Sequence, residues 1–364
     1  MDEITLTAQG ISVSLDLAVG HLAALSIETG GRVLRPLHRA PWLDEPRESL
    51  PAGLSEGTVR LSGDFLCAPF SRSDVEDAPL HGWPANSRWD VVENAATGEG
   101  WRAVLRLCRK VMGAAVEKTL RLRHGHPFLY QEHAFVGGSG AISVAHHAMT
   151  AMREGGRLAV SPKRLAATPD APLEPDPARG RFFLAYPARS ADLAGFPTAA
   201  GGTTDLCDYG MEPREDFVTL VEADHGGPGW TAVARRAERD LVLVLKNPAE
   251  LPVTMLWISN GGRDYAPWNG RHRGVLGIED GRTAIGHAAS IGDNWLKREG
   301  VATAFALAPG GRVAFRQVIG ALPLEDGLPP ASLAVEAGRL RLEMAYGAVR
   351  QTPFDGAFLR LGEA

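Results

Sequence analysis

Short runs in which apolar and polar residues alternate dominate the chain. They fall at 3–9, 11–17, 101–111, 114–123, 128–136, 216–224, 230–237, 240–247, 253–259 and 311–320. In the run 114–123, the even-numbered residues from Val116 to Leu122 share one face, and the charged residues gather mainly on the other. This period of two is typical of a β-strand with one buried face. The pattern predicts a protein built mainly from strands.

Glycine and proline lie between these runs, at 125–127, 137–140, 226–229 and 308–311, as expected of hairpins and loops. Only 288–299 and 212–217 are compatible with a helical turn. A parallel sheet needs a helix between successive strands, so we expect an all-β fold, a large antiparallel sandwich. The irregular segments 32–60 and 161–181 are interpreted as long loops, which makes 1–364 a single domain.

Composition narrows the classes of function. Hydrophobic residues make up 45% of the chain, charged residues 22%, and the formal net charge is −5 without a basic block, which argues against nucleic-acid binding. No run approaches the roughly 20 apolar residues of a membrane span. The first ten residues lack the pattern of a secretory signal, so we expect a cytoplasmic protein. The three cysteines are predicted to be free, buried thiols. Alternation does not predict the oligomeric state.

Histidines provide the first candidate chemistry. In the run AISVAHHAMTAM, strand periodicity places His146 and His147 on opposite faces, one towards a core and the other towards a cleft. Because their side chains diverge, they are poor ligands for one metal ion, and we predict no metal site.

A second candidate region is YAPWNGRHRGVLGIEDG (265–281). Its loop carries Trp268 and His272, and the short strand that follows is predicted to end at Glu279 among small or apolar neighbours. Burial raises the pKa of a carboxyl group and suits it to act as a base. A surface glutamate at a strand end is the alternative.

A third region is HGWPANSRW, residues 81–89. It places His81 before a glycine that permits a tight turn, with Trp83 and Trp89 nearby. We expect Trp89 to anchor the next strand in the core.

These segments together resemble the aldose epimerase (galactose mutarotase) family. HGWPANSRW is similar to the family's His-Gly segment, and GDFLCAPFSRSD (63–74) to its arginine-bearing segment. VAHHAMTAM is similar to the strand with the second histidine, and GVLGIED to the late strand with the catalytic glutamate. The resemblance implies a β-supersandwich that interconverts sugar anomers with no metal and no cofactor.

The resemblance also implies roles for individual residues. Glu279 becomes the general base and His147 the general acid, while His81 binds the sugar ring. The implied substrate-binding residues are listed here: Arg72, Asp224, His146, Trp83, Trp268 and His272.

The sequence departs from the family pattern at two points. The family's second histidine usually follows asparagine and precedes an aromatic residue, whereas here His146 precedes His147 and Ala148 follows, so His146 is a second candidate for the acid. The family's substrate-binding aspartate has only a loose counterpart, Asp224, with His225 beside it.

Three functions follow from these observations. The first is an epimerase acting on a small sugar, either free or phosphorylated. A phosphorylated sugar is considered because four arginines, whose planar side chains suit phosphate, lie in or next to these segments: Arg72, Arg88, Arg271 and Arg273. The second is a carbohydrate-binding protein without turnover. The third is a glycoside hydrolase or lyase, for which only Asp64 is available to partner Glu279.

Overall fold

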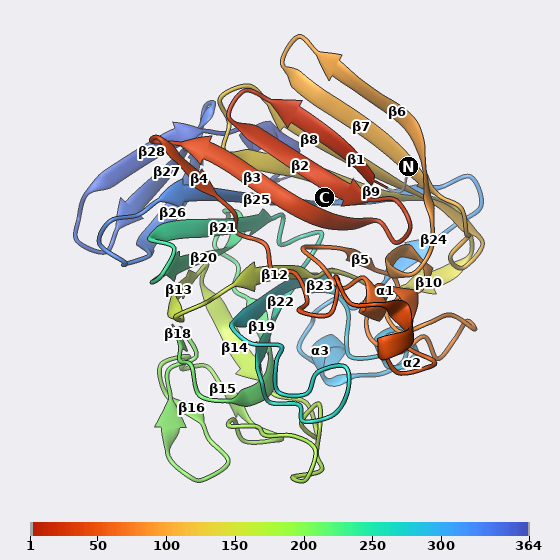
Figure 1. Ribbon diagram of the computed structural model, residues 1–364, viewed down its shortest axis with the longest axis vertical. Coiled ribbons are helices and arrows are strands. Elements are labelled where there is room, and N and C mark those ends of the chain that lie inside the picture. The colour runs from red at the N-terminus through yellow and green to blue at the C-terminus, as the bar shows by residue number, and fades with distance from the viewer. Residues whose placement is uncertain (1–2, 363–364) are drawn as a thin grey trace.

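The computed structural model describes residues 3–362, and its elements are almost all β-strands in antiparallel pairs (Figure 1). The fold class is therefore all-β, as predicted. The largest sheet has nine strands, in the order β18 (Asp208–Tyr209), β13 (Gly156–Val160), β20 (Gly229–Arg235), β21 (Asp240–Lys246), β25 (Arg312–Pro323), β9 (Phe128–Gly137), β8 (Ala114–Arg123), β7 (Gly100–Leu107) and β6 (Trp89–Thr97).

The second large sheet has eight strands and carries the candidate site. Its order is β15 (Arg189–Ser190), β14 (Lys163–Ala167), β19 (Arg214–Glu222), β22 (Val253–Asn260), β23 (Val275–Arg282), β11 (Val144–His146) and β5 (Leu66–Cys67), with β12 (Ala148–Ala151) also paired to β23.

Smaller elements complete the fold. The N-terminal sheet contains β1 (Glu3–Ala8), β2 (Ile11–Asp16), β3 (His21–Thr29) and β4 (Arg32–Leu34), and the C-terminal sheet contains β26 (Pro330–Glu336), β27 (Arg339–Met344) and β28 (Val349–Pro353). Two-stranded pairs are β10 (Gly140–Ile142) with β24 (Phe305–Leu307), and β16 (Phe196–Pro197) with β17 (Thr203–Thr204). The helices are α1 (Glu56–Val59), α2 (His287–Ile291) and α3 (Trp295–Arg298), with 3₁₀ turns η1 (Arg47–Ser49), η2 (Trp83–Ala85) and η3 (Gly356–Leu359).

The main core lies between facing sheets. Val244 of β21, Leu256 of β22 and Ile278 of β23 belong to one buried apolar cluster, so the two large sheets pack face to face. The N-terminal sheet packs on β7 and β8, where alternate residues such as Leu120 are buried (Figure 1). The alternation within 114–123 therefore marks the buried face, as expected for a covered strand.

Each large sheet also buries residues on its other side. The C-terminal sheet covers β21, where Leu340 and Leu342 join a cluster with Leu243. Loops cover the outer face of the eight-stranded sheet, where Trp257 and Met255 pack in a cluster that includes Phe65. The candidate site lies among these loops.

Two local predictions need correction. Residues 212–217 are not helical, because β19 begins at Arg214 and is buried throughout. Of the cysteines, Cys67 is buried, but Cys108 is exposed, so the prediction of buried thiols fails there. The segment 288–299 does contain helical turns, α2 and α3. No helix in the described part of the chain has the length and apolar character needed to cross a membrane.

Candidate active site

A pocket of about 290 Å³ opens on the outer face of the eight-stranded sheet. Four of the predicted site residues, Glu279, His147, His81 and Trp268, line it. The other lining residues are Ser55, Gly57, Thr58, Leu61, Phe65, Phe70, Ser71, Leu80, Ala85, Asn86, Leu173, Phe217, Trp257, Arg263 and Ile285. Residues from four separate segments of the sequence thus converge on one cavity.

Glu279 reaches the pocket because of the alternation along β23. Leu276 and Ile278 face the core between the sheets, whereas Glu279 points to the opposite side. The sequence predicted that the strand ends at Glu279, but the strand continues to Arg282, so Glu279 lies within it. Its side chain is 2% exposed, and burial raises the pKa of its carboxyl group well above the usual value.

His147 faces Glu279 across the boundary between β11 and β12. Its Nε2 lies 3.1 Å from Oε1 of Glu279, and its ring stacks on Phe65 with centroids 4.5 Å apart. Burial, and then the neighbouring imidazole of His81, lower the pKa of His147 well below the usual value. Within the described structure, Nδ1 of His147 and Oε2 of Glu279 have no hydrogen-bond partner. A buried carboxyl and a buried imidazole in contact can share and transfer one proton.

His81 approaches this pair from the turn that precedes η2. The residue has φ 65°, and Gly82 follows with φ 75°, where a Cβ atom would lie 1.9 Å from the carbonyl oxygen of Ala68. Only glycine fits that approach of the backbones. The His81 ring is perpendicular to that of His147, with centroids 5.4 Å apart. Burial of the ring, followed by the charge of Arg263, lowers the pKa of His81 to about 4, so it is uncharged at neutral pH.

An arginine and two tryptophans form another wall, of which the sequence indicated only Trp268. The Arg263 guanidinium lies 4.4 Å from the Trp268 ring centroid and pairs with Glu215 at 3.0 Å. Glu215 also accepts hydrogen bonds from Nε1 of Trp257 and Oγ of Ser259. A signal for Arg263 existed in the sequence, since the glycine pair at 261–262 marks a turn directly after an apolar run.

His146 and His272 do not line the pocket. His146 points between the large sheets, where its ring lies 4.9 Å from His133 and 5.7 Å from Phe315. The divergence of the two adjacent histidines is the one that strand periodicity predicts, and His147 is the member on the pocket side. His272 lies behind Trp268, with ring centroids 5.0 Å apart.

Trp83, Arg72 and Asp224 also lie outside the pocket. Trp83 packs partly buried against the main core, with the Arg109 guanidinium 4.7 Å from its ring centroid. Arg72 and Asp224 are exposed, the latter in the connection between β19 and β20. Trp89 is fully buried and anchors the start of β6, as expected.

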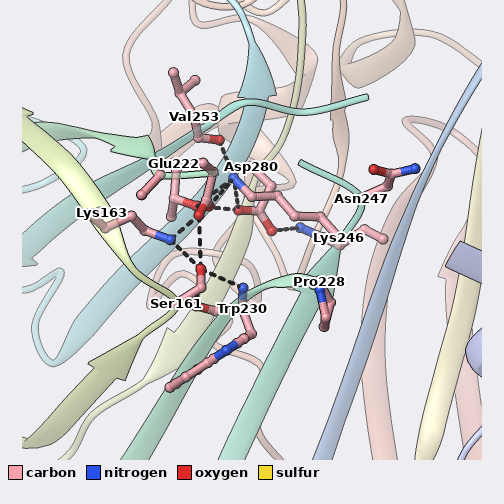
Figure 2. Close-up of polar contacts among 12 residues, drawn as sticks. Ser161, Lys163, Glu222, Pro228, Trp230, Lys246, Asn247, Val253 and Asp280 are labelled. Carbon is pink, nitrogen blue, oxygen red and sulfur yellow. Dashed lines mark hydrogen bonds and ion pairs between the residues drawn. The ribbon is translucent and has the colours of Figure 1, made fainter. Parts of the chain in front are cut away.

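Glu279 has a charged neighbour on the opposite side of β23, Asp280, which enters a buried network between the large sheets. Lys246 Nζ lies 3.1 Å from Asp280 Oδ1 and 3.0 Å from Glu222 Oε1, and Lys163 Nζ lies 2.7 Å from the same Glu222 oxygen. Figure 2 shows both ammonium groups pointing towards these carboxylates. Buried charges of this kind persist only when they are paired.

The same network reaches the strand that carries His147. Gln317 donates to Asp280 at 3.0 Å, and Gln131 donates both to Gln317 at 3.0 Å and to Asp64 at 2.7 Å. Asp64 in turn accepts the backbone N–H of His147 at 3.0 Å. One continuous set of buried hydrogen bonds therefore holds the backbone at both members of the pair.

No group of three or more histidine, cysteine, aspartate or glutamate side chains within residues 3–362 is arranged to hold a metal ion.

The structure of this chain resembles known proteins, whereas its sequence does not. No protein-family model and no curated protein matches the sequence. Among solved structures, a candidate aldose 1-epimerase of Escherichia coli K12 matches with a TM-score of 0.59 and 14% identity, over 88% of this chain and 99% of that one. A galactose mutarotase-like protein from Clostridium acetobutylicum matches with a TM-score of 0.57 and 14% identity, over 88% and 95%.

The fold is the galactose mutarotase-like β-supersandwich. A third structure, a candidate aldose 1-epimerase from Klebsiella pneumoniae, matches with a TM-score of 0.56 and 16% identity, over 87% of this chain and 78% of that one. At such low identities the structural similarity shows the galactose mutarotase-like fold alone, and an activity has to be argued from the residues of the site.

Proposed function

We propose that the protein is an aldose epimerase that interconverts the anomers of a small sugar by opening and closing its ring. The observation that carries the proposal is the contact between Glu279 and His147, at 3.1 Å, inside the pocket of a galactose mutarotase-like fold. The two oxygens of a cyclic hemiacetal are bonded to one carbon, so an acid and a base that lie side by side can serve both of them.

The pair carries the proton that this reaction needs. When the shared proton has moved from Glu279 to His147, the Glu279 carboxylate accepts the proton of the anomeric hydroxyl, and the bond between C1 and the ring oxygen breaks as the carbonyl forms. The ring oxygen accepts a proton from His147. Rotation about C1–C2 and closure on the other face reverse both transfers. The pair holds one proton before and after each step, so no external acid or base is consumed.

His81 and Trp268 are the proposed sugar-binding residues. His81 presents an uncharged imidazole beside the pair, which suits hydrogen bonding to a ring or hydroxyl oxygen. Trp268 offers an aromatic face to the carbons of a pyranose. Arg72, Asp224 and Trp83 have no role in this proposal, because they lie outside the pocket.

Hydrolysis fits the site less well. Most glycosidases use two carboxyl groups across the scissile bond. Among the described residues that line the pocket, Glu279 is the only one with a carboxyl group, and Asp64 is bound to the backbone of His147 and to Gln131.

Saturation-transfer NMR on a panel of aldoses tests the proposal, because it detects accelerated exchange between anomer signals. The wild type should accelerate exchange for at least one sugar, and His147→Asn should lose that acceleration. His146→Asn is the matched control and should keep it, with thermal melts of both variants to verify folding. Binding of sugars without any accelerated exchange would favour a carbohydrate-binding protein instead.

A further inference from the structure

Apolar side chains dominate the pocket to an extent that restricts its ligand. Its apolar lining includes Phe65, Phe70, Phe217, Trp257, Trp268 and Ile285. A hexopyranose carries a hydroxyl group on nearly every carbon, and each hydroxyl that loses water without gaining a partner weakens binding.

Several polar side chains in the lining are already committed to holding the loops. Asn86 accepts the N–H of Gly57 and donates to the carbonyl oxygens of Leu80 and Gly82. The hydroxyls of Ser55 and Thr58 lie 3.0 Å apart and pair with each other. These groups therefore offer few free donors or acceptors to a sugar.

The wall formed by Arg263 and Trp257 is committed only in part. Nε1 of Trp257 and the guanidinium of Arg263 both engage Glu215, which is buried beneath them. Among the described lining residues, the hydrogen-bonding groups left for a sugar lie mainly in the catalytic pair, His81, Ser71 and Nε of Arg263, which is buried without a hydrogen-bond partner.

The charge of the pocket disfavours a phosphate group. Arg263 is the only lysine or arginine among the described residues that line it, and Glu215 balances its charge. The arginines that suggested phosphate from the sequence lie elsewhere: Arg271 pairs with Glu45, and Arg273 donates to a backbone carbonyl in its own loop. A phosphate would enter this site without a free cation to receive it.

We propose that the substrate is an uncharged deoxy sugar, a pyranose in which at least one hydroxyl is replaced by hydrogen. Where that hydroxyl belongs to the hydroxymethyl group, the replacement leaves a methyl group. This inference rests on the proposed epimerase function and names its substrate class. The exposed leucines of the lining support it, because Leu80 and Leu173 are 49% and 38% exposed and extend the apolar surface to solvent. A methyl group packs against the buried part of this wall, at Phe65 and Phe70, whereas a hydroxymethyl group leaves its hydroxyl unpaired there.

Anomer exchange measured on matched pairs of sugars tests the inference. The pairs are D-galactose with D-fucose, D-glucose with 6-deoxy-D-glucose, and L-mannose with L-rhamnose, with glucose 6-phosphate as the charged probe. In at least one pair the deoxy sugar should have a kcat/KM about 10- to 100-fold above that of its parent hexose. A parent hexose or glucose 6-phosphate that matches or exceeds every deoxy sugar overturns the inference and leaves the epimerase function standing. No accelerated exchange for any sugar overturns the epimerase function, and the inference with it.

Substitutions at Ile285 test the apolar wall directly. Ile285→Thr and Ile285→Val both shorten the side chain, but only the threonine adds a hydroxyl. The ratio of kcat/KM for the preferred deoxy sugar to that for its parent hexose should fall several-fold in Ile285→Thr relative to Ile285→Val. Equal ratios in the two variants contradict the claim that the wall sets the preference.

Discussion

Glu222 provides a direct test of how the buried network behind the site is held. Its Oε1 faces the ammonium groups of both Lys163 and Lys246, and its Oε2 accepts a hydrogen bond from Ser161 at 2.9 Å. Glu222→Gln keeps the size of the side chain and removes its charge. Lys246 retains Asp280 as a partner, but Lys163 loses its only carboxylate partner among the described residues.

The magnitude follows from burial. Neither lysine side chain is exposed, and removing one partner of a buried ion pair costs about 3–5 kcal/mol. Burial already lowers the pKa of Lys163 to about 8, against the attraction of Glu222. We therefore expect Glu222→Gln to lower the free energy of unfolding by about 3–5 kcal/mol at pH 7.

The effect should depend on pH in both directions. Burial raises the pKa of Glu222, but the charges of both lysines outweigh it, so the folded pKa lies below the unfolded value of 4.5. The stabilisation by the Glu222 carboxylate is therefore present above pH 4.5 and is lost as the pH falls through the folded pKa. Glu222 raises the pKa of Lys163, so in the variant Lys163 releases its proton below about pH 8, and part of the difference between variant and wild type disappears as the pH rises towards 8. The difference between variant and wild type should be largest between these two limits, above about pH 5 and below the pH at which the variant's Lys163 releases its proton.

Denaturant unfolding followed by tryptophan fluorescence at several pH values measures this difference. Asp293→Asn, which removes an exposed partner of Arg298, is the control and should change stability by less than about 1 kcal/mol. The double variant Glu222→Leu with Lys163→Met should recover much of the loss, because apolar side chains tolerate this interior. A Glu222→Gln variant within about 1 kcal/mol of wild type at pH 7 would refute the reasoning.

Three further predictions concern the pair and the histidines around it. The pH profile of kcat/KM should lack a transition near pH 6.5. The raised pKa of Glu279 and the lowered pKa of His147 move the gain and loss of the shared proton away from that pH. A transition centred at pH 6.5 would contradict the assignment. Asp64→Ala should lower kcat about 10- to 100-fold with a smaller change in KM, while Asp64→Asn, which keeps an acceptor for the His147 N–H, should retain more activity; equal kcat values in the two variants would count against positioning by this bond. The pKa values of His38 and His81 are both lowered to about 4, so as the pH falls below 6.5 these residues take up protons in the unfolded chain before they do so in the fold. Each residue should therefore cost about 2 kcal/mol of stability at pH 5. Thermal melts that show no loss of stability between pH 7 and 5 would contradict this.

Much of the fold could be predicted because alternation survives in the strands with one covered face. The run 114–123 shows it clearly, and the same period separates His146 from His147. The failures come where both faces are covered. Residues 212–217 look polar and helical, yet β19 is buried because distant groups satisfy its charges: Asp216 accepts backbone N–H groups of Phe183 and Leu184. Partners so far away along the chain leave no local signal.

The site was only partly predictable for the same reason. Glu279 and His147 are indicated by their strands, but Arg263 and Trp257 acquire their place through Glu215, which belongs to the strand mistaken for a helix. Arg72 and Asp224, which the family resemblance implied as substrate-binding residues, lie outside the pocket.

The most direct test of the account is anomer exchange in Glu279→Gln. Glutamine fills the same space and keeps an oxygen near His147 but cannot take up the proton of the anomeric hydroxyl. We predict that saturation transfer between anomer signals falls about 10²- to 10⁴-fold towards the uncatalysed rate, while line broadening shows that the sugar still binds. An exchange rate equal to that of the wild type would contradict the central claim that Glu279 is the base.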